Sequence, residues 1–234
     1  MDGLYLAASG AAAGLQTLDF VTSNLANLST PGFRRVMATT QAVNGNGSPY
    51  EYAEAPASAS IDMHQGPLQS TGNPLDVAIT GSGFLVVQTP DGYAYTRNGE
   101  LQISESGELM AAGAPVVGEG GGTITLTPGT VSVGGDGTIS VNGQPRGRIA
   151  LADPSGLTLT PIGQGLYRPA GGATLPLGGE GQFHQGFIET STGSDVAQMV
   201  SMMSISRNYE SSMKAVQAID ENHSRTIDAF TLNA

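Results

Sequence analysis

Histidine is the side chain best suited to acid–base catalysis and metal binding near neutral pH, and the chain has three: His64, His184 and His223. None stands in an H-x-x-H or H-E-x-x-H arrangement, which would place two metal ligands on one face of a helix. His184 lies in a glycine-rich stretch and is expected in a turn. The histidine pattern therefore predicts no metal site.

Carboxylates and nucleophile motifs give the same answer. Asp76, Asp91 and Asp136 stand singly in expected turns, without the carboxylate pair that glycoside hydrolysis requires. The chain contains no nucleophile elbow, phosphate-binding loop, dinucleotide fingerprint or calcium loop. It also has no cysteine, which excludes disulfides and thiolate metal sites. We therefore expect no catalytic, cofactor-binding or metal-ligating residues, and a protein that is not an enzyme.

Net charge narrows the possible partners. The chain carries 20 acidic against 9 basic residues, a net charge of −11, and its only adjacent basic pair is Arg34-Arg35. Nucleic acids and anionic membranes both need clustered basic residues, so neither is expected as a partner. No apolar run reaches the ~18 residues that suggest a membrane span, and residues 1–15 lack the basic start of a signal peptide. Export, if it occurs, would need no signal cleavage.

The positions that could carry function lie instead on two helices predicted at the ends of the chain. Residues 3–28 show a bulky apolar stripe at heptad-like spacing and a second stripe of small residues, Gly3, Ala7, Gly10 and Gly14. Glycines four apart in a helix suggest that another backbone packs closely there. We expect the bulky stripe to pair with the other helix and the small one to be covered by other copies or by related subunits. The predicted assembly residues here are Leu4, Ala8, Gly10, Ala11, Gly14, Leu15, Leu18 and Leu25.

Residues 195–231 predict the second helix, with Ser194 or Asp195 as its N-cap. Four methionines, at 199, 202, 203 and 213, favour either ordinary core packing or an adaptable surface for non-identical neighbours. Both interpretations stay open at this point. The predicted assembly residues are Val196, Met199, Met203, Tyr209, Met213, Val216, Ile219, Ile227 and Phe230.

Between the helices, short β-rich runs alternate with turns. Pro90-Asp91-Gly92 separates residues 84–88 from 93–96, Ser104–Gly107 separates 101–103 from 108–110, and Asn142-Gly143 lies between 138–141 and 148–151. We predict a mixed fold in which long N- and C-terminal α-helices form a coiled-coil-like layer around an all-β, sandwich- or barrel-like central domain. The expected segments are 1–32, an N-terminal helix; 33–68, an extended or hairpin linker; 69–188, the β domain; and 189–234, a C-terminal helix.

Five motifs, in order along nearly the whole chain, resemble the flagellar rod and hook family. They are S-N-L-A-N-L-S-T-P-G-F-R at 23–34, T-G-N-P-L-D-V-A-I at 71–79, Y-T-R-N-G at 95–99, Q-G-F-I-E at 185–189 and R-N-Y-E at 207–210. In the first motif the family residues at the helix end are Asn24, Asn27, Thr30, Pro31, Gly32 and Phe33. Asparagine and Thr-Pro-Gly can satisfy backbone groups where a helix stops abruptly.

The resemblance implies a structural subunit that polymerises through its terminal helices into the torque-transmitting rod of the flagellar basal body. Its partners would be itself, other axial rod and hook proteins, and the flagellar type III export apparatus; its location would be the periplasm-spanning rod. Within the family, the short chain is most similar in length to a proximal rod subunit. A distal rod subunit is the alternative. An alternative of another class is a secreted carbohydrate-binding module or enzyme with coiled-coil ends.

Overall fold

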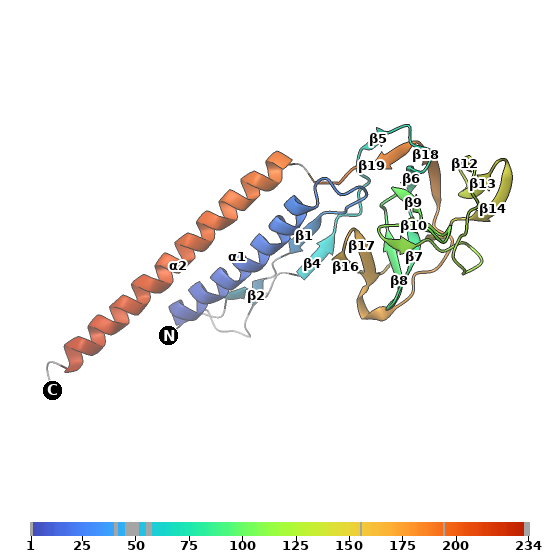
Figure 1. Ribbon diagram of the computed structural model, residues 1–234. Coiled ribbons are helices and arrows are strands. Elements are labelled where there is room, and N and C mark those ends of the chain that lie inside the picture. The colour runs from blue at the N-terminus through green and yellow to red at the C-terminus, as the bar shows by residue number, and fades with distance from the viewer. Residues whose placement is uncertain are drawn as a thin grey trace. The chain divides into compact units, whose positions relative to one another are not determined.

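The computed structural model describes residues 2–39, 42–44, 52–54, 58–154, 156–193 and 195–231 (Figure 1). The chain divides into two compact units. Unit 1 contains Met1–Ala26, Val36–Ala59 and Ser194–Ala234, and unit 2 contains Asn27–Arg35 and Ser60–Gly193. The backbone thus passes from one unit to the other four times, after residues 26, 35, 59 and 193.

Unit 1 is built around two helices that lie side by side, α1 (Asp2–Ala26) and α2 (Asp195–Thr231) (Figure 1). It also contains β1 (Val36–Thr39), β2 (Ala42–Asn44) and β3 (Tyr52–Glu54), and β2 and β3 form an antiparallel pair. The strand β4 (Ser58–Ile61) carries the chain from unit 1 into unit 2. A helix of 37 residues such as α2 extends over roughly 55 Å at 1.5 Å per residue.

Unit 2 consists of short strands and one turn of 3-10 helix. Its elements are β5 (Leu68–Ser70), β6 (Val77–Gly81), β7 (Phe84–Thr89), β8 (Gly92–Thr96), β9 (Leu101–Ile103), β10 (Leu109–Ala111), β11 (Ala114–Pro115), β12 (Val131–Val133), β13 (Thr138–Val141), β14 (Gln144–Arg148), β15 (Leu151–Ala152), β16 (Leu159–Gly163), β17 (Leu166–Pro169), η1 (Ala170–Gly172), β18 (Gly181–Gln185) and β19 (Phe187–Glu189).

The largest sheet of unit 2 has five antiparallel strands in the order β15-β7-β8-β17-β16. Its strand β7 begins with four consecutive buried residues because both of its faces are covered. Unit 2 also contains four smaller sheets, β11-β10-β9, β12-β13-β14, β18-β6 and β19-β5. Apolar residues from these sheets form two buried clusters, one around Leu85, Ile139 and Phe183 and the other around Phe84, Tyr95 and Tyr167.

The predicted hairpins are confirmed in unit 2. β7 and β8 pair across Pro90-Asp91-Gly92, and β9 pairs with β10 across residues 104–108. β13 and β14 pair across Asn142 and Gly143, whose φ values of 52° and 77° match the two left-handed positions of a type I′ turn. The second strand of this hairpin starts at Gln144, directly after the turn, and not at the predicted residue 148.

The predicted fold class is wrong. The described chain has two α-helices of unequal length, 25 and 37 residues, and they do not form a coiled-coil-like layer. A coiled coil buries its bulky heptad residues, whereas Leu15 of α1 and Met199 and Met203 of α2 are exposed. The centre is mostly β-sheet, as predicted, and frequent turns cut it into strands of two to six residues that make several small sheets.

One further expectation fails in unit 2. His184 does not occupy a turn but lies in β18, opposite Ala78 of β6, where its ring nitrogen Nε2 is 3.0 Å from the Thr80 hydroxyl. The predicted segment boundaries at residues 32, 68 and 188 stay a prediction.

Candidate assembly surface

Small residues of α1 face α2 inside unit 1. Ala13 is buried, and a Cβ placed on Gly14 would lie 3.9 Å from the Cβ of Tyr209 on α2. At Gly14 the neighbouring element is therefore α2 of the same chain, and the close packing of another backbone predicted from Gly10 and Gly14 stays a prediction. The expectation that other copies or related subunits cover this small stripe stays a prediction.

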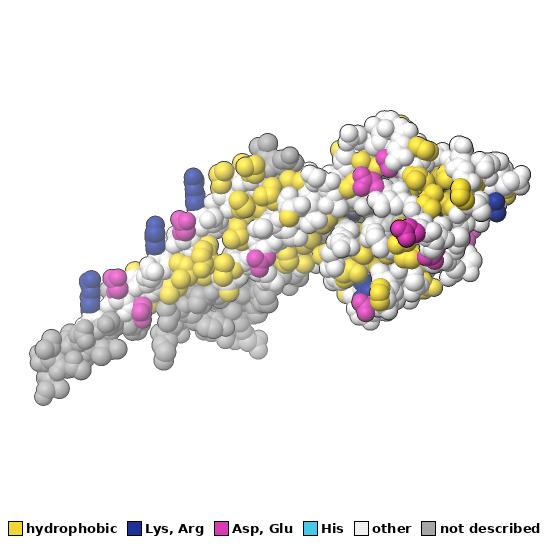
Figure 2. All heavy atoms as spheres, in the orientation of Figure 1, with side chains coloured by type: hydrophobic (Ala, Val, Ile, Leu, Met, Phe, Trp, Pro, Cys, Tyr) yellow, Lys and Arg dark blue, Asp and Glu magenta, His cyan; other side chains and the backbone are white. Residues whose placement is uncertain are grey.

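Large apolar side chains remain exposed on both helices. The relative exposure is 45% for Leu15, 48% for Met199, 61% for Val200 and 53% for Met203. Figure 2 shows hydrophobic side chains gathered along the helix pair. We call these four residues the apolar helix face.

The remaining predicted assembly residues divide by burial. Ala11 is buried on α1, while Leu18 and Leu25 are half-buried. Tyr209, Met213, Val216 and Ile219 are half-buried on α2. The methionines thus follow both interpretations, since Met199 and Met203 are exposed and Met202 and Met213 are half-buried. Five predicted side chains lie outside the described ones: Leu4, Ala8, Val196, Ile227 and Phe230.

The first residue of the helix-end motif, Asn24, forms the pair of backbone hydrogen bonds that a neighbouring strand would otherwise form with Val36. Asn24 is buried in unit 1; its Nδ2 donates to the Val36 carbonyl at 2.8 Å, and its Oδ1 accepts from the Val36 N–H at 2.8 Å. Both backbone groups of Val36 are thereby satisfied. An asparagine suits this position because it is both a donor and an acceptor.

The rest of the motif makes a tight turn in unit 2. The Thr30 N–H donates to the Asn27 carbonyl at 3.1 Å, and the Phe33 N–H donates to the Thr30 carbonyl at 3.2 Å. Gly32 has φ +66°, and a Cβ there would lie 2.1 Å from the carbonyl carbon of Arg97, so only glycine fits. Pro31 precedes it, and the Phe33 ring is buried.

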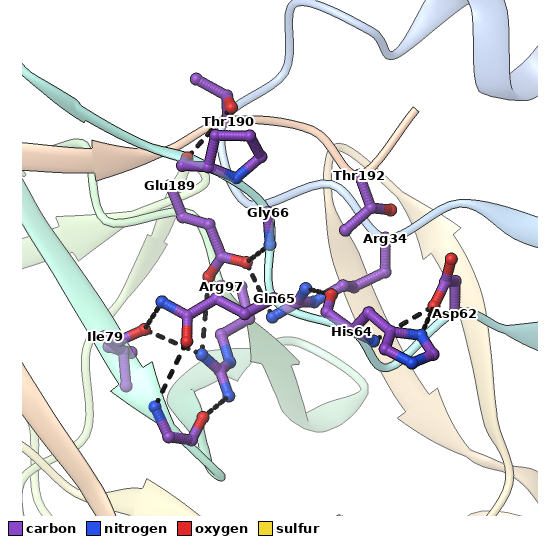
Figure 3. Close-up of polar contacts among 12 residues, drawn as sticks. Arg34, Asp62, His64, Gln65, Gly66, Ile79, Arg97, Glu189, Thr190 and Thr192 are labelled. Atoms are coloured by element: carbon purple, nitrogen blue, oxygen red, sulfur yellow. Dashed lines mark hydrogen bonds and ion pairs between the residues drawn. The ribbon is translucent and has the colours of Figure 1, made fainter. Parts of the chain in front are cut away.

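A buried ion cluster holds the segments of unit 2 that lead toward unit 1 (Figure 3). Glu189 is 1% exposed; it binds Arg34 at 2.8 Å and Arg97 at 3.5 Å, and its Oε1 accepts the Gly66 N–H at 2.7 Å. Its backbone carbonyl accepts the Gly32 N–H at 2.7 Å. One carboxylate therefore joins residues close to three of the four points where the backbone changes unit.

Both arginines of the cluster also donate to the backbone. Arg97 donates to the Ile79 carbonyl at 3.0 Å and the Gly81 carbonyl at 2.6 Å, and Arg34 donates to the His64 carbonyl. Burial, and then the charge of Arg34, lower the pKa of Arg97 to about 10, which leaves it cationic at neutral pH. Burial raises the pKa of Tyr167, whose hydroxyl accepts the Arg34 N–H, to about 12.

A second ion pair flanks the cluster. Arg35 binds Asp62 at 2.9 Å, and the His64 Nδ1 lies 2.6 Å from the same carboxylate. Burial alone would raise the pKa of Asp62, but the hydrogen bonds from His64 and Arg35 outweigh it and lower the pKa below 3.8.

Sequence reasoning missed the ion cluster. Arg34-Arg35 drew attention only as a basic pair too short to form a binding patch. The sequence did contain one signal for it. Each cluster member is a charged residue within a different family-like motif, in a chain with only 12% charged residues.

The described residues contain no group of three or more His, Cys, Asp or Glu side chains placed to hold a metal ion. No described helix is long and apolar enough to cross a membrane. A hollow of about 700 Å³ lies in unit 2, but its only aromatic lining residue is Phe84, which is 1% exposed and covered by the Arg97 guanidinium.

Three family models match the chain in order. They describe a flagella basal body rod protein (residues 4–34), the D1 domain of flagellar hook protein FlgE/F/G (residues 78–141) and the C-terminal part of flagellar basal body rod FlgEFG proteins (residues 184–229). The rod protein FlgF of Salmonella typhimurium is 36% identical, and that of Escherichia coli 33%, each over 100% of both chains. FlgF of Caulobacter vibrioides is 36% identical over 91% of both chains.

The chain belongs to the flagellar basal-body rod protein family. The predicted resemblance is confirmed, together with the likeness to the proximal rod protein FlgF and the function of a structural rod subunit. A FlgG rod protein, from Buchnera aphidicola, is 30% identical over 93% of this chain. Each family model matches a segment with one member of the ion cluster: Arg34, Arg97 or Glu189.

Proposed function

We propose that this rod-family chain polymerises through its apolar helix face, Leu15, Met199, Val200 and Met203. The observation that carries the proposal is the exposure of these four large apolar side chains, 45–61%, on adjacent helices. Burying one such side chain fully is worth roughly 1.5–3 kcal/mol. Covering the face with a neighbouring subunit therefore stabilises the assembly by several kcal/mol. The unfavourable exposure of these side chains to water remains only in the free subunit.

The proposal assigns roles to the rest of the chain. The predicted segments 1–32 and 189–234 supply the contacts between subunits, and 33–68 and 69–188 are carried by them. The partners are other copies and other rod- and hook-family proteins, and the chain reaches the periplasm-spanning rod through the flagellar type III export apparatus without cleavage of a signal peptide. No reaction is required, since the subunit transmits torque mechanically.

Charge substitution on the apolar helix face tests the proposal in cells that lack the native protein. Leu15→Glu and Met203→Glu should abolish motility and rod assembly, because each places a carboxylate in an interface that becomes dry. Gln217→Glu is the matched control, since it adds the same charge at an exposed position about 21 Å further along α2. It should leave motility unchanged.

Circular dichroism of the purified variants separates an assembly defect from a folding defect. The helix content of Leu15→Glu and Met203→Glu should equal that of the native chain, because both side chains are already half in solvent. Wild-type motility of both variants would refute the proposed interface.

The alternative of a carbohydrate-binding module or enzyme gains no support from a specific observation. Sugar sites commonly use an exposed aromatic ring as an apolar platform. The hollow beside Arg97 offers only the covered ring of Phe84. Saturable binding of a soluble glycan by the full chain would favour this alternative.

A further inference from the structure

A groove between the two helices of unit 1 has no side chain in it. It encloses about 350 Å³ and is lined by Gly10, Ala13, Gly14 and Thr17 of α1 and by Ile205, Asn208 and Ser212 of α2. The α1 side of the groove consists of small residues, which leave room between the helices. The groove lies within one unit and between described residues.

Met203 lies on the side of α2 opposite this groove. With 100° per residue, Met203 is rotated by about 170° around α2 from the mean direction of Ile205, Asn208 and Ser212. Met203 is 53% exposed, and its unbranched thioether fills irregular spaces well. The chain therefore carries a hollow on one side of α2 and a flexible apolar side chain on the other.

The groove and Met203 lie on opposite sides of α2, and this arrangement decides which kind of contact between copies they can form. A hollow and a protrusion on opposite sides of one helix join copies head to tail, which gives a ring or an open helical filament, whereas a two-fold dimer needs the same patch on both partners. Met203 precedes the groove centre near Asn208 by five residues, or about 8 Å along the axis. Each added copy would then be displaced by about that amount along α2.

We infer that Met203 of one copy of this chain inserts into the groove between α1 and α2 of a second copy. The inference rests on the proposed function, since it names the contact through which the apolar helix face assembles. It makes the occupant of the groove a second copy, because the protrusion, its apolar surroundings at Met199 and Val200, and the hollow all belong to the same continuous helix pair.

Disulfide cross-linking tests the contact, because the chain contains no cysteine of its own. The variant Met203→Cys with Ser212→Cys should give dimers and larger ladders in isolated basal bodies after mild oxidation. Nine residues of helix separate the two positions by about 14 Å, so they cannot join within one chain. The control pair Met203→Cys with Ser211→Cys, rotated one residue out of the groove, should remain at least fivefold less cross-linked.

A substitution that fills the groove tests the same contact independently of the cysteine pair. Gly14→Leu should suppress the ladder at least fivefold, although leucine favours a helix over glycine and should not reduce helix content. Ala12→Leu adds the same side chain at an exposed position of α1 and should leave the ladder unchanged. If the cysteine pair itself prevents assembly, a photo-cross-linking residue at position 212 of the otherwise native chain provides the readout by mass spectrometry.

The outcomes separate the two proposals. Motile cells whose Met203/Ser212 pair stays monomeric, or cross-links no better than the control pair, would overturn the groove contact and leave the apolar helix face standing. Capture from position 212 of a different protein, or of a site distant from Met203, would also overturn it. Motility of the Leu15→Glu and Met203→Glu variants would instead remove the proposed function.

Discussion

The ion cluster of Glu189, Arg34 and Arg97 offers the sharpest quantitative test of the structure. Glu189→Gln keeps the shape of the side chain and removes its charge, which leaves two arginines, 1% and 4% exposed, without a counter-charge. Removing one partner of a buried ion pair costs about 3–5 kcal/mol. For a protein of this size, the loss corresponds to a fall in Tm on the order of 10 °C.

Urea denaturation followed by tyrosine fluorescence and circular dichroism measures this loss, since the chain has seven tyrosines and no tryptophan. Glu180→Gln is the control, because Glu180 lies on the surface of the same unit and forms no ion pair among the described residues. It should change the free energy of unfolding by less than about 0.5 kcal/mol.

A third variant separates charge from packing. Replacing all three members with apolar residues, Arg34→Met, Arg97→Met and Glu189→Leu, should recover only part of the stability. No buried charge then lacks a partner, but the Gly66 N–H and the carbonyls of Ile79, Gly81 and His64 lose theirs. A loss below about 1 kcal/mol for Glu189→Gln would refute the assignment of Glu189 as the charge that compensates the two arginines.

Three further predictions concern the helix end and its surroundings. Gly32→Ala should destabilise the protein by more than about 2 kcal/mol in urea denaturation, because φ is +66° and the new Cβ would meet the backbone of Arg97; a neutral effect would mean that the turn relaxes. Asn24→Ala should cost about 1–3 kcal/mol and speed hydrogen exchange at the Val36 amide, which loses its acceptor; unchanged exchange there would contradict the bond. The pKa of Asp62 is lower in the folded than in the unfolded state, so its contribution to stability is complete above pH 3.8 and is lost as pH falls through the folded value. Asp62→Asn should therefore flatten the acid limb of a stability–pH curve, and an unaltered limb would exclude this carboxyl as its source.

The sequence by itself determined the family, the hairpins and the extent of the C-terminal helix. These features depend on local chemistry: a Pro-Asp-Gly or Asn-Gly turn imposes its geometry wherever it stands, and a capped apolar period of 3.6 residues favours a helix in almost any context. The motif around Asn24 and Gly32 is recognisable in the sequence for the same reason. Asn24 satisfies the backbone groups of Val36, and Gly32 adopts a positive φ that favours glycine.

Only the tertiary structure decided which faces meet. Heptad spacing on two helices is equally compatible with a bulky seam and with the arrangement in the structure, where Ala13 and Gly14 lie on the side of α1 that faces α2, because both lie on continuous stripes of α1. The predicted coiled-coil-like layer of the two helices is wrong for this reason. The tertiary structure also decided which charges pair in the ion cluster, because Arg34, Arg97 and Glu189 are far apart in sequence and become partners only where three segments of unit 2 converge. A charge in an isolated motif indicates nothing of the charge that folding places against it.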